Sequence, residues 1–240
     1  RSSDLKYQDI ADGSHSNVAR LFEVCEERPN KGVYRLYVQG VGTSFADIGE
    51  PVPHEHGASM GAMGGPRIRY ALLYVANQIA IKVARRPLVP ESPRSIAAAV
   101  STESLLPRWR RQLTHMLTAS QNPKIDEIVF DVFGFSRGAT AARSFIHQLK
   151  RSFCDVDGIF CGVPMRIRFV GLFDTVASVG LADSVPAPGV EGHQDWGDES
   201  LLTIPADVEK CVHMVAAHEA RASFPLDSVR RVSGGYPSRC

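Results

Sequence analysis

A serine lies between two glycines in the pentad Gly134-Phe135-Ser136-Arg137-Gly138. A G-x-S-x-G pentad is typical of a nucleophile elbow, a sharp strand-to-helix turn that exposes a serine hydroxyl for attack on an ester or amide carbonyl. The pentad alone is a weak signal, because chains with this content of glycine and serine also contain it by chance. The alternative is a tight turn whose serine is structural.

The residues around the pentad supply the strand and the helix that an elbow requires. Residues 127–135 form an apolar run that predicts a buried strand, and residues 137–153 carry small and apolar side chains at helical spacing. The serine then stands at the carboxyl end of a strand, where ligands bind in open α/β sheets. We expect Gly134 and Gly138 to let neighbouring segments approach closely. The sequence therefore predicts Ser136 as the nucleophile.

A serine nucleophile also needs an oxyanion donor, a base and an orienting carboxylate. The backbone amide of Arg137 begins the predicted helix, so it can donate to a developing oxyanion with the helix dipole behind it. In α/β enzymes with an elbow, the order along the chain is serine, then aspartate or glutamate, then histidine. We therefore look for the acid and the base after the pentad.

Asp174 is the best candidate for the acid. It ends the apolar run 166–174, which predicts a second buried strand, and a carboxylate at the carboxyl end of such a strand is well placed for this role. The alternative is an aspartate that caps the strand. The competitors without a comparable strand before them are Asp195, Asp198 and Asp227.

Three histidines follow Asp174 and could act as the base. His193 lies in a polar loop, whereas His213 and His218 lie five residues apart in one predicted element, residues 211–224, which fits a strand, a helix or both. A hydrogen-bonded structural histidine is the alternative for both of these. His218 is the best candidate of the three, but no loop pattern that would present it over the serine follows it.

The elements that must position these residues predict an α/β fold. Apolar residues make up 44% of the 240 residues, enough for a single domain over 1–240 with a sizeable core. A helix with Asn17 as its cap, a strand over 33–38 and a helix over 67–86 precede the elbow. Alternation of apolar strands with helices predicts a mostly parallel sheet with helices on both faces.

A second helix is predicted over 101–120, after a loop that contains Pro87, Pro90 and Pro93. Its apolar side is interleaved with Arg108, Arg110 and Arg111, which fits an interfacial helix or lid, although a helix that covers the sheet is favoured.

Charge and cysteine usage exclude several functional classes. A formal net charge of +1 provides no field for nucleic acid and no polybasic membrane anchor. No apolar run reaches the length of about 18 residues that a membrane span needs. The five cysteines form no C-x-x-C pair, which predicts reduced thiols. His54 and His56 lack a further ligand cluster and are interpreted as part of a solvated loop, and the glycines of residues 61–67 as a flexible turn, so we expect neither a metal nor a cofactor.

Read together, several motifs resemble a known family. The long elbow "FGFSRGATAAR", the acid segment "GLFDTVASVG" and the segment "VHMVAAHEARASFPLDS" are similar to the first family of type VI secretion lipase effectors, which are antibacterial phospholipases with an α/β-hydrolase-like domain. "YVQGVGT" and "NVARLF" fit the same pattern, so the resemblance spans nearly the whole chain.

The resemblance implies Ser136 as nucleophile and Asp174 as acid. It also implies a base in a glycine-rich histidine motif that follows a "FPLDS…YP" stretch, and this chain ends at Cys240 just after such a stretch. We therefore expect a domain that is incomplete at both ends, with its histidine beyond Cys240. The "AAHEAR" segment that contains His218 matches a separate family element.

The expected function is a serine esterase of A1 or A2 type that hydrolyses the acyl esters of membrane phospholipids. Two alternatives stay open: a serine hydrolase for soluble esters, and a non-catalytic scaffold or binding fragment with the same fold. The resemblance further implies a cognate immunity protein, a secretion spike partner, synthesis in the bacterial cytoplasm and delivery by the type VI system into the periplasm of a target cell.

Overall fold

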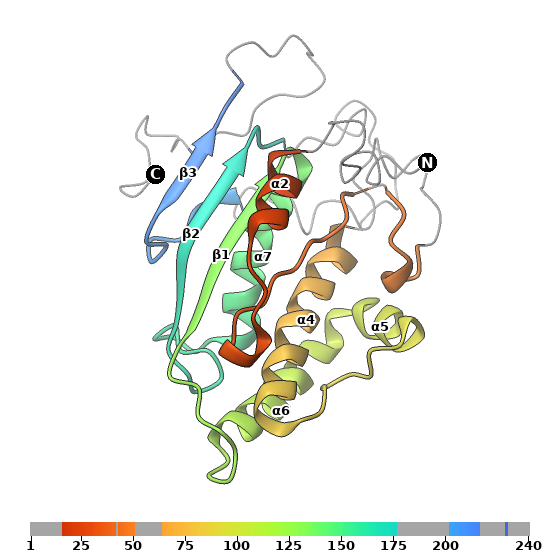
Figure 1. The fold of residues 1–240 in the computed structure, drawn as a ribbon, viewed down its shortest axis with the longest axis vertical. Helices are drawn as coiled ribbons and strands as arrows, with labels where there is room; N and C mark the ends of the chain where they lie inside the picture. Colours follow the sequence, from red (N-terminus) through yellow and green to blue (C-terminus); the bar gives the residue numbers. More distant parts are fainter. Residues whose placement is uncertain (1–15, 42, 51–63, 177–201, 217–228, 230–240) are drawn as a thin grey trace.

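The computed structural model describes residues 16–41, 43–50, 64–176, 202–216 and 229 (Figure 1). In this part of the chain, the strands β1 (Ile128–Phe135), β2 (Met165–Phe173) and β3 (Cys211–Met214) form one sheet in the order β1-β2-β3. Both neighbouring pairs are parallel. The α/β class, the parallel sheet and the two strands predicted around the elbow and the acid are confirmed. The predicted burial holds for most of the carboxyl half of β2 but not for β1, in which only Gly134 is buried.

The register of the sheet brings three strand ends together. β1 pairs with β2 from Ile128↔Met165 to Phe135↔Phe173, with an irregularity after Phe130. β2 pairs with β3 up to Phe173↔Met214. Phe135, Phe173 and Met214 are therefore neighbours at the carboxyl edge, and the residue that follows each of them lies at the same edge of the sheet.

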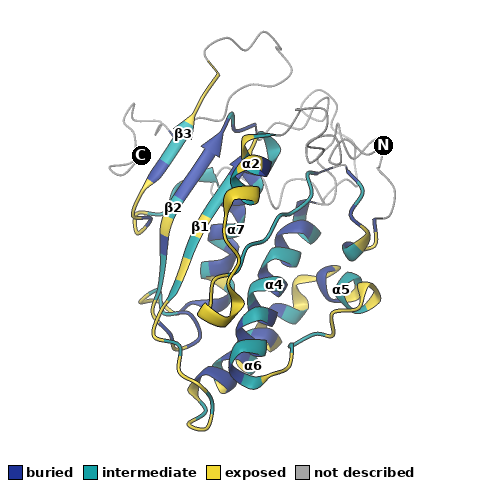
Figure 2. Ribbon diagram, in the orientation of Figure 1, coloured by how far each residue is buried: buried dark blue, intermediate teal, exposed yellow. Residues whose placement is uncertain are grey.

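Helix α7 (Arg137–Phe153) packs against β1 on one face of the sheet. The other long helices extend this layer by packing on α7 and on one another: α4 (Gly64–Ala84) packs on α7, α5 (Pro93–Val100) on α4, and α6 (Leu106–Thr118) on both α4 and α7. The buried apolar residues form one cluster, and Figure 2 shows them concentrated on β2, α4 and α7. The helices predicted over 67–86 and 101–120 are confirmed. The sequence did not predict α5, which begins after Ser92 caps its first turn inside the proline-containing loop.

The arginine-containing helix α6 packs on other helices rather than directly on the sheet. Its apolar side packs against α4 and α7, while Arg108 and Arg111 are exposed. The buried residues on that side are Leu106, Trp109, Leu113, Met116 and Leu117.

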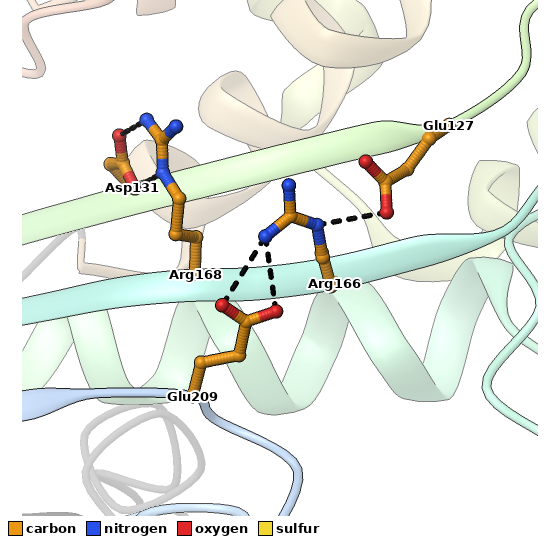
Figure 3. Close-up of polar contacts among 5 residues, drawn as sticks. All are labelled: Glu127, Asp131, Arg166, Arg168 and Glu209. Atoms are coloured by element: carbon orange, nitrogen blue, oxygen red, sulfur yellow. Dashed lines mark hydrogen bonds and ion pairs between the residues drawn. The ribbon is translucent and has the colours of Figure 1, made fainter.

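The opposite face of the sheet is partly polar. The short helix α2 (Asn17–Val24) packs against β1 and crosses in front of it in Figure 1, with α7 behind. Ser16 caps α2 instead of the predicted Asn17, its Oγ accepting from the amide of Ala19 at 3.1 Å. Nearer the amino edge, this face carries charged side chains that pair with one another (Figure 3).

The ion pairs link the three strands across this face. Arg166 Nε donates to Glu127 Oε1 at 2.8 Å, and its Nη1 donates to both carboxylate oxygens of Glu209 at 3.1 and 3.2 Å. Arg168 pairs with Asp131. Exposed pairs of this kind contribute little to the stability of a fold, because solvent and salt screen them. In the described residues, this end of the sheet therefore presents charge to solvent rather than an apolar surface for a helix.

The strand predicted over 33–38 is wrong. Val33 forms a single bridge with Arg28, and residues 34–40 contain no strand. The backbone of this segment bonds to side chains of α4 instead, because Tyr74 Oη donates to the carbonyl of Arg35 at 3.0 Å and Arg67 Nε donates to that of Gln39 at 3.0 Å. The apolar residues of this segment are half-buried beside α4 and do not pair in a strand.

A buried ion pair fixes the next segment to the start of α4. Arg67 Nη1 donates to Glu50 Oε2 at 2.7 Å, and its Nη2 donates to the carbonyl of Thr43 at 2.7 Å. Arg67 and Glu50 are each 2% exposed. Removing one partner of such a pair leaves an uncompensated buried charge, so residues 39–50 are strongly held at this position.

The oxidation state of the cysteines differs from the prediction at one position. Cys25, Cys154 and Cys161 are free, but Cys211 is disulfide-bonded, so the expectation of five reduced thiols is wrong. No helix in the described residues has the length and the apolar character needed to cross a membrane. His54 and His56 lie outside the described residues.

Candidate active site

Ser136 occupies a strained turn between a strand and a helix. It follows β1 directly and precedes α7, with φ 54° and ψ −125°. A positive φ is uncommon for a residue other than glycine and persists only where the surroundings enforce it. The amide of Ser136 donates to the carbonyl of Phe173 at 2.8 Å, and its carbonyl accepts from the amide of Ala139 at 2.9 Å. The strand, sharp turn and helix of an elbow are therefore all present.

The two glycines of the pentad have different environments. A Cβ on Gly134 would lie 2.4 Å from the carbonyl oxygen of Gly138 and 2.5 Å from the Cα of Ala139. Helix α7 thus returns so closely over the end of β1 that only glycine fits at this position. A Cβ on Gly138 would meet nothing within 4 Å. The predicted close approach is confirmed for Gly134 and wrong for Gly138.

The hydroxyl of Ser136 does not cap the helix that follows it. Ser136 is in the N-cap position of α7, where serine commonly accepts a hydrogen bond from the first turn, but its side chain makes no such bond. Its backbone conformation also lies outside the extended region that capping residues adopt. Arg137 is the first residue of α7, as predicted, so its amide belongs to the positive end of the helix dipole.

Asp174 stands at the equivalent place on β2. It follows the last strand residue, has φ 44°, and its amide donates to the carbonyl of Met214 at 2.9 Å. Its Oδ1 accepts from the amide of Ala216, so part of the carboxylate orients the chain after β3. Because Phe135 and Phe173 are register partners, Ser136 and Asp174 lie together at the carboxyl edge. Asp195, Asp198 and Asp227 lie outside the described residues.

His213 is hydrogen-bonded to the residue that follows Asp174. On β3, its Nε2 lies 3.1 Å from Thr175 Oγ1 and accepts from the amide of Thr175 at 3.4 Å. Burial, followed by the charge of Arg143, lowers the pKa of His213 to about 4, against the opposing influence of Asp174. A neutral imidazole whose Nε2 is already an acceptor matches the hydrogen-bonded structural alternative. His193 and His218 lie outside the described residues.

Three polar residues that the sequence did not single out hold the acid segment. Thr140 Oγ1 donates to the carbonyl of Val176 at 2.8 Å, and Arg143 Nη2 donates to Thr175 Oγ1 at 3.1 Å. Thr140 and Thr175 are 0% exposed and Arg143 is 1% exposed. The sequence feature that could have identified Thr140 and Arg143 is their polar character within "GATAAR", on a helix face whose other residues point to the core.

One part of the chain matches the model of a known protein family. Residues 151–238 match the family model of the type VI secretion phospholipase effector Tle1-like catalytic domain. This segment includes Asp174 and β3. The match confirms the resemblance that was drawn from the sequence motifs. No curated protein matches the chain.

Two solved structures are similar to the chain. A crystal structure of an uncharacterized protein from Pseudomonas aeruginosa is 33% identical over 93% of this chain, with a TM-score of 0.72. The chain covers 35% of that protein, so it spans about a third of its length. A structure of the Tle1 effector bound to the VgrG spike of the type 6 secretion system is 25% identical, covers 60% of this chain and 30% of that one, and has a TM-score of 0.31.

Proposed function

We propose that this chain, which carries a type VI secretion phospholipase effector Tle1-like catalytic domain over residues 151–238, is part of a serine esterase with an α/β-hydrolase-like fold. Ser136 is the nucleophile and Asp174 the acid. The observation that carries the proposal is the juxtaposition of the strained, non-capping Ser136 with Asp174 at the carboxyl edge of a parallel sheet. Both residues fit the roles that the elbow arrangement requires.

The proposed reaction has two halves. Ser136 Oγ attacks the ester carbonyl carbon while a histidine takes the hydroxyl proton, and the carbonyl oxygen becomes an oxyanion that the amide of Arg137 stabilises. The ester C–O bond then breaks, and the leaving alcohol takes the proton from the histidine. Water attacks the acyl-serine by the same route in the second half, which releases the fatty acid and restores Ser136. Asp174 orients the histidine throughout.

The base belongs outside the described residues. Of the histidines described, His213 is engaged by Thr175, His147 Nε2 lies 2.8 Å from the carbonyl of Thr203, and His115 is exposed on α6. His218 is the candidate within the chain, and the family resemblance favours a histidine after the stretch that ends at Cys240. We keep both as alternatives.

The proposed substrates are the acyl esters of phospholipids, cleaved at the A1 or A2 position, in the periplasm of a target cell. The family match supports a phospholipid rather than a soluble ester. It also supports delivery by the type VI system, with a spike protein as carrier and a cognate immunity protein in the producing cell. These partners are proposals for the full-length protein.

The test compares hydrolysis by the full-length protein and its Ser136→Ala variant on phospholipid vesicles and on a monomeric ester. Ser152→Ala, a serine-to-alanine change at the far end of α7, is the control. The proposal predicts release of fatty acid from vesicles by the wild type and the control, and none by Ser136→Ala. Turnover of the monomeric ester alone would favour a soluble-ester hydrolase. Normal turnover by Ser136→Ala would rule out the assignment.

A further inference from the structure

The helix that begins at the nucleophile also holds the segment that contains the acid. Thr140 and Arg143 of α7 contact residues 174–176 through the bonds to Val176 and Thr175 described above. The amide of Val176 in turn donates to the carbonyl of Ser136 at 3.4 Å. Residues 174–176 are therefore attached to α7 by hydrogen bonds from its N-cap and from two of its side chains.

The same segment is attached to β3 on its other side. The amide of Asp174 donates to Met214, and Asp174 Oδ1 accepts from Ala216. Thr175 approaches His213 through both its amide and its hydroxyl. Thr175 thus contacts Arg143 on α7 and His213 on β3 through a single hydroxyl.

The proton positions in this chain of hydrogen bonds are determined by chemistry. A guanidinium only donates, so Thr175 Oγ1 accepts from Arg143. The hydroxyl proton of Thr175 is then available to His213 Nε2, which also accepts from the Thr175 amide and therefore carries no proton. Donation therefore runs in one direction, from Arg143 to Thr175 and from Thr175 to His213. Both bonds together require one orientation of the threonine side chain.

Burying the guanidinium of Arg143 costs free energy, because a charged group is removed from water. Arg143 is 1% exposed, and a well-packed apolar side chain of similar volume commonly stabilises a fold at least as well as a buried charged group. Besides Thr175, Arg143 donates to the carbonyl of Leu202 at 3.0 Å. The bonds of its two terminal nitrogens therefore reach two separate segments that follow β2, one of them directly after the acid.

We infer that Arg143 and Thr175 are positioning residues for the proposed reaction: through the hydrogen bonds from Arg143 to Thr175 and on to His213, they fix Asp174 relative to Ser136. Thr140 contributes through Val176. The inference rests on the proposed serine esterase function. It links the positions of the acid and the nucleophile, because α7 begins directly after Ser136 and also holds the backbone beside Asp174 by hydrogen bonds. A misplacement of about 1 Å in such a pair can lower the rate by about a hundredfold.

The test uses the full-length protein with three threonine variants. Thr175→Val keeps the side-chain shape and removes the hydroxyl, whereas Thr175→Ser keeps the hydroxyl. Thr114→Val is the matched control, because Thr114 Oγ1 donates to Arg110 at 2.9 Å within α6, outside the site. The measurements are kcat and KM on phospholipid vesicles, the pH dependence of kcat/KM, the melting temperature, and labelling of Ser136 by a fluorophosphonate.

The inference predicts that Thr175→Val lowers kcat at least about tenfold with KM within about twofold, and shifts the acid limb of the kcat/KM profile, because a loosely held carboxylate orients the base less well. Thr175→Ser restores kcat to within about threefold of the wild type. Thr114→Val leaves kcat and the profile unchanged even if its melting temperature falls. If Thr175→Val does not fold, Thr140→Val and Thr140→Ser provide the same comparison.

Two results would overturn the inference in distinguishable ways. In the first, the wild type is active and the folded Thr175→Val variant has the same kcat and pH profile. This result would show that the hydrogen bonds only stabilise the fold. A wild type that neither hydrolyses esters nor labels at Ser136 would instead overturn the proposed function, and the positioning role with it.

Discussion

Ser136 and Asp174 each follow one member of the same register pair, Phe135 and Phe173, on adjacent parallel strands, and both leave the sheet with a positive φ, 54° and 44°. Helix α7 begins directly after Ser136 and packs closely over Gly134 of β1. The two strained turns therefore place a hydroxyl and a carboxylate at one edge of the sheet. Backbone strain of this kind clusters at functional sites, which supports the proposed site.

The close approach of α7 to β1 predicts a strong position dependence for alanine in the pentad. Gly134→Ala introduces a Cβ that would lie 2.4 Å from a backbone oxygen, and we expect it to lower the free energy of unfolding by about 1–3 kcal/mol. Gly138→Ala meets no neighbour within 4 Å and lies in a helix, so it should be neutral or stabilise by up to about 1 kcal/mol. Chemical denaturation measures both, and equal losses would contradict the elbow geometry.

The acid role of Asp174 predicts a selective loss of activity. Asp174→Asn keeps the shape of the side chain but not the charge that orients and stabilises a protonated histidine, so kcat should fall at least about a hundredfold. Asp131→Asn is the matched control, because Asp131 pairs with Arg168 on the polar face of the sheet. Hydrolysis of phospholipid vesicles measures both. Comparable kcat values for the two variants would remove Asp174 from the mechanism.

The neutral state of His213 predicts a pH-dependent stability. Burial and Arg143 on α7 lower its pKa from 6.5 to about 4, while Asp174 after β2 opposes them. As the pH falls through this window, the unfolded chain binds a proton that the folded chain does not, so the free energy of unfolding decreases. Because His213 is only half-buried, the loss should be at most about 2 kcal/mol.

Denaturation of the wild type and of His213→Gln between pH 7 and 4 measures this contribution. The difference between their free energies of unfolding should be constant above pH 6.5 and should change progressively below it. The control is His115→Gln, because His115 is exposed. Its free energy of unfolding should decrease with falling pH as that of the wild type does. A constant difference between the wild type and His213→Gln across the whole range would show that the pKa of His213 is the same in the folded and unfolded chain, and would contradict the lowered pKa.

Strong local patterns made much of the architecture predictable. The mostly apolar runs that became β1 and β2 are typical of strands, and the long apolar stripe of α4 has helical period. The elbow was predictable because glycine is required where helix and strand meet, as Gly134 shows. The position of Asp174 at the carboxyl end of a strand was predictable from the apolar residues before it.

The misses have physical causes that lie outside local sequence. Residues 33–38 are rich in residues typical of strands, but the carbonyls of Arg35 and Gln39 accept hydrogen bonds from Tyr74 and Arg67 of α4 instead. Helix α5 begins in a proline-containing loop, since proline is well suited to the first turn of a helix. The roles of Arg143 and Thr175 depend on contacts between α7, β2 and β3, which no spacing rule reports.

The most direct test of the central claim is covalent labelling of the full-length protein with a fluorophosphonate, followed by mapping of the modified residue by mass spectrometry. A fluorophosphonate reacts with an activated serine, so we predict one modified site, Ser136, with labelling lost in Ser136→Ala and much slower in Asp174→Asn. Labelling of another serine, or none in a folded wild type, would contradict the assignment of Ser136 as the nucleophile.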